Sequence, residues 1–352
     1  MNTAKNKNEP LVSVSLLLWR SEKFIKNCLE SLFAQTHNNL ELFLADNNDS
    51  SDKGVKIAKE ILEKNKDKYH IEFVNHGKNI GFAAGHNLSI IKAKGKYILL
   101  LNQDVVLANN FLEEAVKVLE SDEKIAAIQS RCLRLKQSDG QWKKTDIIDN
   151  FGLVMLKNRR VIGRGQGQLS SGKFLAQEEI FGVDGAAPVF RKAFLEEVKI
   201  CLVDKCEYLD EDFFSYKEDV DLAWRLRLLG GKAVYAPQVT AWHARGSGDS
   251  AAKNYFGIIR ERMKISQFAK ELSFKNQRLM QFKNEQKRLL FRHLPWFLPK
   301  EIAALIYVIL FESFAWRTFK NLIRQTPKAW QKRKIIMARK RVSAKEMGRW
   351  FE

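Results

Sequence analysis

Acidic side chains follow an apolar segment in the first third of the chain. Residues 97–101 are Tyr-Ile-Leu-Leu-Leu, and they run directly into Asn102, Gln103 and Asp104. Such an apolar run predicts a buried strand. In an open α/β sheet, ligands bind at the edge formed by the carboxyl ends of the strands. Asp104 is therefore a candidate contact for a metal ion or a diphosphate.

A second acidic segment begins about a hundred residues later. It contains Asp210-Glu211-Asp212 and then Glu218-Asp219-Val220-Asp221, and His243 follows after another predicted strand. A positioned carboxylate can accept the proton of an attacking hydroxyl group. Carboxylate oxygens are also the ligands that Mg²⁺ and Mn²⁺ prefer, and a histidine suits Mn²⁺ better than Mg²⁺. These features, in this order, predict an enzyme.

Each feature also has a structural explanation. Glu218, Asp219 and Asp221 fall in the first turn of a predicted helix, where capping and the helix dipole favour acids. Asp104 could simply end a strand in a turn. A lone histidine such as His243 is more often structural than a ligand. The joint pattern supports a site better than any single residue does.

The surrounding sequence alternates apolar strands with amphipathic helices. Strands are predicted at residues 11–18, 40–45, 71–74, 97–101, 126–134, 233–235 and 239–243, and helices at 21–33, 55–64, 79–95, 105–120, 191–198 and 218–229. This alternation predicts parallel β-α-β units and an α/β fold. Asp46-Asn47-Asn48 is typical of a turn. Residues 135–180 are a polar, glycine-rich excursion, with short strands predicted around Val154 and Val161.

Charge divides the chain into two parts. The 352 residues carry a net charge of +19, and residues 251–352 hold 24 Lys and Arg against 7 Glu, a net of +17. We therefore predict a catalytic domain at 1–250 and a basic amphipathic helical region at 251–352. A basic region of this kind favours a polyanionic partner, either an anionic membrane surface or a nucleic acid.

The C-terminal region allows two interpretations. Its aromatic residues could enter a membrane interface, or its helices could form a solvated cap on the domain. Helix breaks are predicted at 294–299 and at Thr326-Pro327. The longest apolar run, Ile302–Phe311, is about half the roughly 20 residues that a spanning helix needs, so no transmembrane segment is predicted. The aromatic residues are Trp296, Phe297, Tyr307, Phe311, Phe314, Trp316 and Phe319.

The four cysteines fit neither a disulfide framework nor a zinc site. Cys201 and Cys206 have no second pair at metal-binding spacing, and Cys28 and Cys132 lie far from them. We therefore expect reduced thiols in a cytosolic protein. The N-terminus carries no convincing signal peptide. A cytoplasmic protein, peripheral on the inner face of the cell membrane, is the expected location.

Several of these segments together resemble the inverting family 2 glycosyltransferases, and within them the bacterial rhamnosyltransferase-like branch. The resemblance covers roughly residues 11–245. It implies a GT-A fold, an α/β domain with a mostly parallel central sheet flanked by helices, here followed by the basic C-terminal helical extension. The matching stretches are Asp46-Asn47, 79–87, Asn102-Gln103-Asp104, Gly185-Ala186, 210–214, 218–225 and Trp242-His243.

The resemblance also implies roles for individual residues. Asp219 would be the general base, and Asp104 and His243 would hold a divalent cation, Mn²⁺ or Mg²⁺. Asp210 and Glu218 would lie on the acceptor side. The donor-binding residues would be Asp46, Asn79, Gly81, Asn87, Asn102, Gly185 and Arg225. Two departures stand out in the sequence: Gln103 replaces a usual proline, and the first strand ends in Trp19-Arg20 instead of an Asn-Tyr-Asn type sequence.

The implied reaction moves a sugar from a nucleoside-diphosphate donor, dTDP-rhamnose or a UDP-sugar, to a glycan or lipid-linked acceptor in cell-surface polysaccharide synthesis. Two alternatives stay open. One is a catalytically inactive GT-A-like assembly partner, and the other is a nucleic-acid binder that uses the basic tail. No nucleic acid is expected, because the body is nearly neutral and lacks a recognised nucleic-acid motif.

Overall fold

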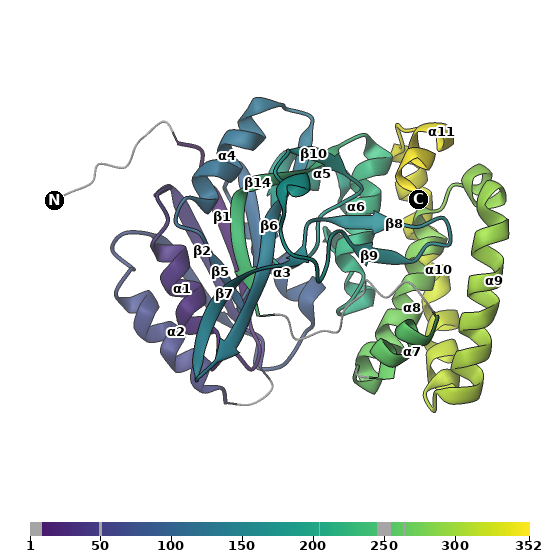
Figure 1. Cartoon of the computed structure of the whole chain (residues 1–352), viewed down its shortest axis with the longest axis horizontal. Helices are drawn as coiled ribbons and strands as arrows, with labels where there is room; N and C mark the ends of the chain where they lie inside the picture. Colours follow the sequence, from purple (N-terminus) through teal and green to yellow (C-terminus); the bar gives the residue numbers. More distant parts are fainter. Residues whose placement is uncertain (1–8, 49–50, 204, 245–254, 264) are drawn as a thin grey trace.

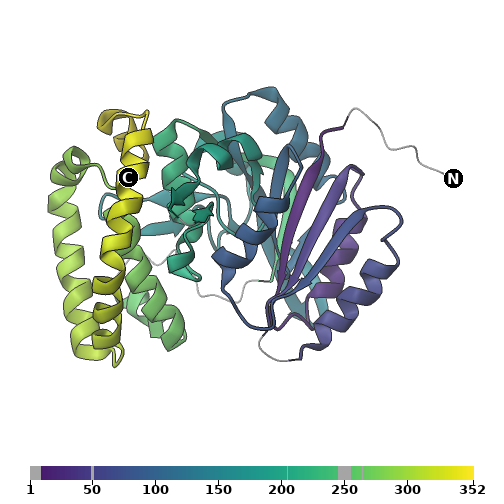
Figure 2. The same cartoon turned by 180° about the vertical axis from the view of Figure 1, so that it is seen from behind.

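A computed structural model describes residues 9–48, 51–203, 205–244, 255–263 and 265–352. A large mixed sheet with helices on both faces forms the N-terminal two thirds, and a group of helices packs at one side of it (Figure 1). The view from behind shows the same two layers of helices and the same lateral group (Figure 2). The predicted α/β class with a C-terminal helical extension is confirmed.

Parallel strands form the first half of the sheet. Its order is β4-β1-β2-β3, with all three pairings parallel. These elements confirm the predicted β-α-β units. They are β1 (Val12–Leu18), α1 (Ile25–Phe33), β2 (Leu40–Asp46), α2 (Lys53–Glu63), β3 (His70–Asn75), α3 (Phe82–Lys92) and β4 (Tyr97–Asn102).

The second half of the sheet is mixed. It consists of β5 (Val105–Leu107), β6 (Ile125–Ser138), β7 (Gln141–Asn150), β10 (Glu178–Ile180), β11 (Val189–Arg191) and β14 (Lys232–His243). β11 lies antiparallel between β4 and β6, and β14 runs parallel to β6. Separate small hairpins pair β8 (Leu153–Met155) with β9 (Val161–Gly163), and β12 (Ile200–Leu202) with β13 (Lys205–Glu207). Short 3₁₀ turns are η1 (Gly172–Phe174), η2 (Glu211–Phe213) and η3 (Gly348–Trp350).

Two cores lie on the two faces of the sheet. The first is shared with α1, α2 and α4 (Phe111–Ser121), and the second with α3, α5 (Lys192–Val198) and α6 (Glu218–Leu229). In β4, Leu99 and Leu101 enter the first core, whereas Ile98 and Leu100 enter the second. A strand covered on both faces needs apolar residues at every position, which explains the uninterrupted run that ends before Asp104.

Two expectations for this domain were wrong. Residues 105–107 form a strand instead of the start of a helix, because they pair with the end of β14, and α4 begins only at Phe111. The excursion at 135–180 contains the long strand β7, which forms a hairpin with β6. The first correction arises from a pairing between distant segments, which the local apolar pattern does not encode. The second is a local hairpin that turns at Asp139-Gly140, a dipeptide typical of hairpin turns.

The C-terminal region is helical, as predicted, but its helices continue through the prolines. They are α7 (Tyr255–Met263), α8 (Gln267–Asn284), α9 (Lys287–Phe311), α10 (Ala315–Arg339) and α11 (Ala344–Met347). The predicted breaks at 294–299 and 326–327 are wrong, because Pro295, Pro299 and Pro327 all lie inside helices and on exposed faces. A proline inside a helix removes one backbone hydrogen bond and its ring strains the preceding turn, but α9 and α10 continue through these positions.

Helix α9 also changes the membrane expectation. With 25 residues and a mean hydropathy of 1.6 in its most apolar window, it has the length and composition of a membrane-spanning helix. The apolar run Ile302–Phe311 is therefore part of a much longer apolar helix. Length and composition alone do not establish a span.

The C-terminal helices share a core with the catalytic part. Trp224 of α6 packs in one cluster with Leu279 of α8 and Ile336 of α10, and the ring of Phe351 lies 5.6 Å from that of Trp224. The expected boundary between 250 and 251 lies outside the described residues. Helices α8, α9 and α10 are packed on the catalytic part through α6.

One cysteine expectation is wrong. Cys201 and Cys206 lie opposite each other on β12 and β13 and form a disulfide, whereas Cys28 and Cys132 are buried thiols outside any disulfide. The hairpin brings the two thiols together across a spacing of five residues. The spacing of the cysteines alone does not reveal that a hairpin pairs two of them.

Candidate active site

A cavity of about 550 Å³ opens where the catalytic part meets the C-terminal helices. Residues from the end of β4, from β7, from the loop before β11, from the start of α6 and from the end of β14 line it. Helices α7 and α8 supply part of its wall through Arg262, Ala269 and Ser273. The charged and amide side chains in its lining are Asn102, Asp149, Asn150, Arg160, Asp184, Lys217, Glu218, Asp219, His243, Glu261 and Arg262.

Strand pairing brings the two predicted metal ligands together. β5 begins directly after Asp104, and its Val105 pairs with His243 at the end of β14. The backbone N–H of Ala244 also donates to the carbonyl of Asp104 at 2.9 Å. As a result, Nε2 of His243 lies 3.3 Å from Oδ1 of Asp104.

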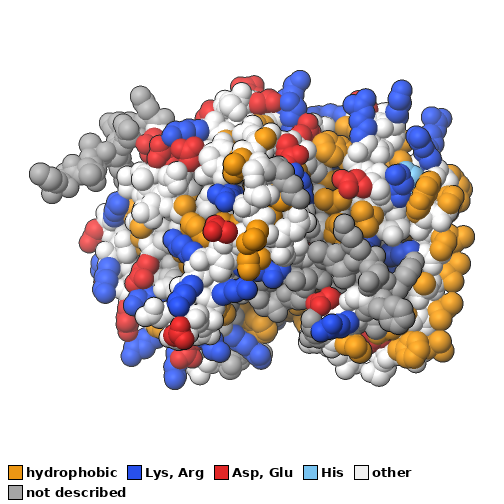
Figure 3. All heavy atoms as spheres, viewed as in Figure 1, with side chains coloured by type: hydrophobic (Ala, Val, Ile, Leu, Met, Phe, Trp, Pro, Cys, Tyr) orange, Lys and Arg blue, Asp and Glu red, His pale blue; other side chains and the backbone are white. Residues whose placement is uncertain are grey.

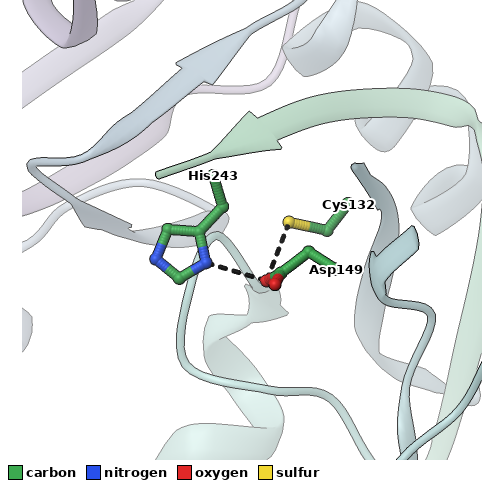
Figure 4. A group of neighbouring side chains, drawn as sticks. All are labelled: Cys132, Asp149 and His243. Carbon is green, nitrogen blue, oxygen red and sulfur yellow. Dashed lines mark hydrogen bonds and ion pairs between the residues drawn. The ribbon is translucent and has the colours of Figure 1, made fainter. Parts of the chain in front are cut away.

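Asp149 is a further member of this group that the sequence did not reveal. Its Oδ2 lies 2.9 Å from Nδ1 of His243 and 4.0 Å from Sγ of Cys132 (Figure 4). Asp149 is buried near the end of β7, a strand whose existence was not predicted. Burial opposes the charge on His243, but the carboxylates of Asp104 and Asp149 outweigh it and raise the pKa of His243 to about 10.

This donor set fits a divalent cation. Asp104 offers a carboxylate oxygen, and His243 would offer Nε2 once the ion displaces its proton; the two atoms lie 3.3 Å apart, which is compatible with adjacent ligands of one ion. Asp149 accepts at the other ring nitrogen, the usual second contact of a metal-binding histidine, which fixes the tautomer and the ring orientation. Mixed carboxylate and imidazole donors suit Mn²⁺ better than Mg²⁺.

The paired acids at the start of α6 face the same cavity. The loop before them is conformationally unusual, because Phe214, Tyr216 and Lys217 all have positive φ. Non-glycine residues held in this region are a local strain often found at functional sites. The loop places both Glu218 and Asp219 in the cavity lining.

The two acids differ in their surroundings. Burial and the neighbouring Asp219 raise the pKa of Glu218 to about 8, and Oε2 of Glu218 is buried without a hydrogen-bond partner. Burial also raises the pKa of Asp219, but Lys217 and backbone N–H groups oppose the shift. Oδ1 of Asp219 accepts from the N–H of Val220 at 2.7 Å. Asp219 is therefore the acid better suited to carry a negative charge at neutral pH.

Another acid stands beside them in the loop before β11. Asp184 is buried, and burial together with Asp149 raises its pKa to about 6. Its Oδ1 accepts from the N–H of Ala186 at 3.0 Å, which shapes the turn that carries Gly185 into the cavity lining. Gly185, predicted to contact the donor, thus lies close to Asp219.

Three predicted donor residues lie together outside the cavity lining. Asp46 ends β2, and the amide of the following Asn47 bonds to Oδ1 of Asn79 at 3.2 Å and to the carbonyl of Gly81 at 3.4 Å. Gly81 has φ +90, and a Cβ there would meet the backbone of Phe214 at 2.6 Å. This group lies at the carboxyl ends of the parallel strands, on the same edge as Asn102.

Three other predicted site residues do not line the cavity. Asn87 is buried and bonds to the backbone of Tyr208 and Leu209. Arg225 pairs with Asp221 at 2.9 Å and donates to two backbone carbonyls. Asp210 is buried between two lysines of the C-terminal helices. The protein partners of each residue explain why an amide, a guanidinium or a carboxylate stands there, so none of the three is assigned to the site.

The departure at Gln103 is compensated locally. Its Oε1 accepts from the N–H of Trp19 at 2.8 Å, and its Nε2 donates to the carbonyl of the same residue at 2.6 Å. The side chain thereby ties the end of β4 to the end of β1. These two hydrogen bonds to the backbone restrain the loop in the place of the usual proline.

Comparison with known proteins places the site in context. The family model "Glycosyl transferase family 2" matches residues 13–198. An uncharacterized glycosyltransferase of Methanocaldococcus jannaschii is 31% identical over 119 residues, which are 34% of this chain and 40% of that protein. The glycosyltransferase GlyG of Streptococcus pneumoniae is 24% identical over 267 residues, 75% of this chain and 80% of the other. The chain spans about two fifths of the length of the Methanocaldococcus jannaschii relative and of two others from Haemophilus influenzae.

A solved structure matches the whole chain. It is the mannosyltransferase PcManGT from Pyrobaculum calidifontis in complex with GDP-Man and Mn²⁺, with a TM-score of 0.51 and 16% identity over 99% of this chain and 90% of that one. At this identity the likeness concerns the fold. It supports the predicted GT-A architecture with its helical extension.

Proposed function

Since the chain belongs to glycosyl transferase family 2, we propose that it transfers a sugar from a nucleoside-diphosphate donor to an acceptor hydroxyl, with inversion at the anomeric carbon. One observation carries the proposal: Asp219 and His243 line one cavity, and Asp104, which does not itself line it, lies 3.3 Å from Nε2 of His243. A proton acceptor and a cation site facing one space are what this reaction needs.

Asp219 would take the proton of the acceptor hydroxyl as its oxygen attacks the anomeric carbon. The new bond forms on the face opposite the diphosphate, and the bond to the diphosphate oxygen breaks in the same step. Burial, which raises the pKa of Asp219, makes it a stronger base near neutral pH. Glu218, with a pKa of about 8, is mostly protonated at pH 7 and would position the acceptor by donating a hydrogen bond.

Asp104 and His243 would hold the divalent cation, Mn²⁺ or Mg²⁺. When bound, the cation neutralises the charge that develops on the leaving diphosphate. Asp149 would orient the ring of His243 through the contact at Nδ1. Asn102 and Gly185 would border the donor, and the group Asp46, Asn79 and Gly81 would contact its nucleoside.

For the donor we propose dTDP-rhamnose or a UDP-sugar, with a glycan or lipid-linked acceptor of cell-surface polysaccharide. These choices rest on the resemblance of the motifs. The cationic side chains Arg160 and Lys217 in the cavity lining suit a phosphate-bearing substrate.

The test is a panel of nucleotide sugars against the purified full chain, with Mn²⁺, with Mg²⁺ and with EDTA. We expect binding and slow hydrolysis of one donor class, both lost in EDTA and in Asp104→Ala. Asp122→Asn, at a half-buried acid that pairs with Lys232 and does not line the cavity, serves as the control that keeps both. Binding of no donor under any condition would instead favour an inactive assembly partner.

A further inference from the structure

Helix α9 presents an apolar outer face to solvent. Its exposed hydrophobic side chains recur at helical spacing, and Phe291 and Ile309 at the two ends are 67% and 61% exposed. Figure 3 shows hydrophobic side chains gathered along this edge of the molecule, at the right of the view. The stripe consists of Phe291, Leu298, Ile302, Ile306 and Ile309. A soluble chain rarely leaves so continuous an apolar strip uncovered without a binding role.

The charges of α9 in this stretch point away from the stripe. Between residues 294 and 311 the only charged residues are Lys300 and Glu301. They pair with each other, and Glu301 also pairs with Arg278 of α8 at 2.8 Å. An interior ion-pair group of this kind opposes a membrane-spanning arrangement of α9, because the charges would enter hydrocarbon.

The turn between α9 and α10 continues the apolar surface. Leu310, Phe311 and Trp316 are 67%, 70% and 82% exposed. The one acid in the turn, Glu312, faces inward and pairs with Arg262 at 2.9 Å. The turn therefore presents large apolar side chains without an exposed carboxylate.

Basic residues border this surface. Lys287, Arg288 and Arg292 are exposed at the start of α9, next to Phe291. On the outer side of α10, large apolar residues recur every seven positions, and exposed Lys and Arg stand among them. The apolar residues are Trp316, Ile323 and Trp330, and the basic ones are Lys320, Arg324 and Lys334. Tryptophan beside lysine and arginine is the composition of a membrane interface.

We propose that the α9 face, meaning the stripe together with Leu310, Phe311 and Trp316, lies in the headgroup boundary of an anionic membrane. The apolar side chains would enter the acyl boundary, and the neighbouring Lys and Arg would meet anionic headgroups. Charge complementarity favours lipid over a second copy of the chain, because two copies would bring like charges together. The surface belongs to helices packed on the cavity wall, so binding would hold the active site near a lipid-linked acceptor.

The test is flotation of the full chain with two kinds of vesicle, one of phosphatidylcholine alone and one that also contains phosphatidylglycerol. We expect selective binding to the anionic vesicles that weakens with salt. The double variant Phe311→Ser, Trp316→Ser should lower the partition coefficient by about tenfold or more, because it removes two large interfacial side chains. The matched control Leu169→Ser, Leu175→Ser removes two exposed apolar residues elsewhere and should bind as the wild type does.

Three results would overturn the proposal. The first is equal flotation with neutral and anionic vesicles, and the second is equal binding by the wild type and the Phe311, Trp316 variant. The third is a wild-type dimer in solution that this variant converts to a monomer, which would assign the α9 face to a second copy. Because these readouts need no donor, they are independent of the proposed reaction. The variants change exposed side chains only, and circular dichroism melting checks their folding.

Discussion

Two groups of acids in this protein have the same residue types and opposite surroundings. The paired group contacts two fully buried lysines, Lys283 of α8 and Lys332 of α10, and Arg225 and Lys328 add two further cations. The acids of the cavity group line the cavity, except Asp104, which pairs with His243 as Asp149 does. The acids of the paired group are Glu207, Asp210, Asp212 and Asp221, and those of the cavity group are Asp104, Asp149, Asp184, Glu218 and Asp219.

The pKa shifts of Asp210, Asp184 and Glu218 follow this difference, whereas burial and the neighbouring Asp210 raise the pKa of Glu207 in spite of Lys332. Burial raises the pKa of Asp210, but Lys283 and Lys332 outweigh burial and hold it well below its usual range. In the cavity group, burial and neighbouring carboxylates raise the pKa of Asp184 to about 6 and that of Glu218 to about 8. Acids neutralised by the protein build structure, whereas acids left without enough cation remain available for a metal and for proton transfer.

Breaking the paired group should have the largest effect. Lys332 is 0% exposed and contacts Glu207, Asp210 and Asp212. Lys332→Met should lower the free energy of unfolding by about 3–5 kcal/mol, because it leaves buried carboxylates without a partner. Urea denaturation measures the change. The control is Lys328→Met on the same helix. The side chain of Lys328 is 47% exposed, so its pair with Asp212 should contribute less than about 1 kcal/mol to the free energy of unfolding. Equal losses in the two variants would contradict the distinction.

Substitutions in the cavity group are expected to change turnover more than stability. Asp219→Asn should lower kcat by about 10²–10⁴-fold, the usual contribution of a positioned base. The donor Kd should stay near the wild-type value, since Asp219 is assigned to the acceptor. Initial rates and calorimetric titration with the active donor separate the two effects. A variant with full turnover would show that another group is the base.

The pH dependence of stability tests the role of Glu218 in the cavity group. Its folded-state pKa is raised to about 8, so the stability that comes from its protonated form is complete below pH 4.5 and is lost as pH rises through 8. Glu218→Gln keeps a neutral side chain and should gain stability relative to the wild type over this range, on the order of 2 kcal/mol. Thermal melting of both proteins in EDTA between pH 5 and 9 measures this difference in stability. A constant difference across the range would exclude the assigned titration.

Asp149 tests how the cavity group is organised. Asp149→Asn preserves the size of the side chain but weakens the hold on Nδ1 of His243. Mn²⁺ affinity, measured by electron paramagnetic resonance without substrate, should fall by about 10–100-fold. Cys132→Ala removes the other neighbour of Asp149 and should change affinity much less. If both variants bind Mn²⁺ like the wild type, Asp149 does not position the ligand.

Local patterns in the sequence were sufficient for much of the fold. The helix predicted at 218–229 is α6, Glu218–Leu229, and Gly230 ends it with φ +95 as a glycine stop does. The first four strands were also predicted within one or two residues. These features depend on hydrophobic periodicity and turn chemistry, which act over a few neighbouring residues.

The sequence by itself determined the α/β class, the acids at strand and helix ends, and the basic, aromatic character of the last hundred residues. Only the tertiary structure decided which acids face the cavity, that Asp149 joins His243, and that Lys283 and Lys332 neutralise Asp210. The reason is physical: the state of a carboxylate depends on burial and on charges within a few ångströms. Here those charges come from segments more than 70 residues away in the chain.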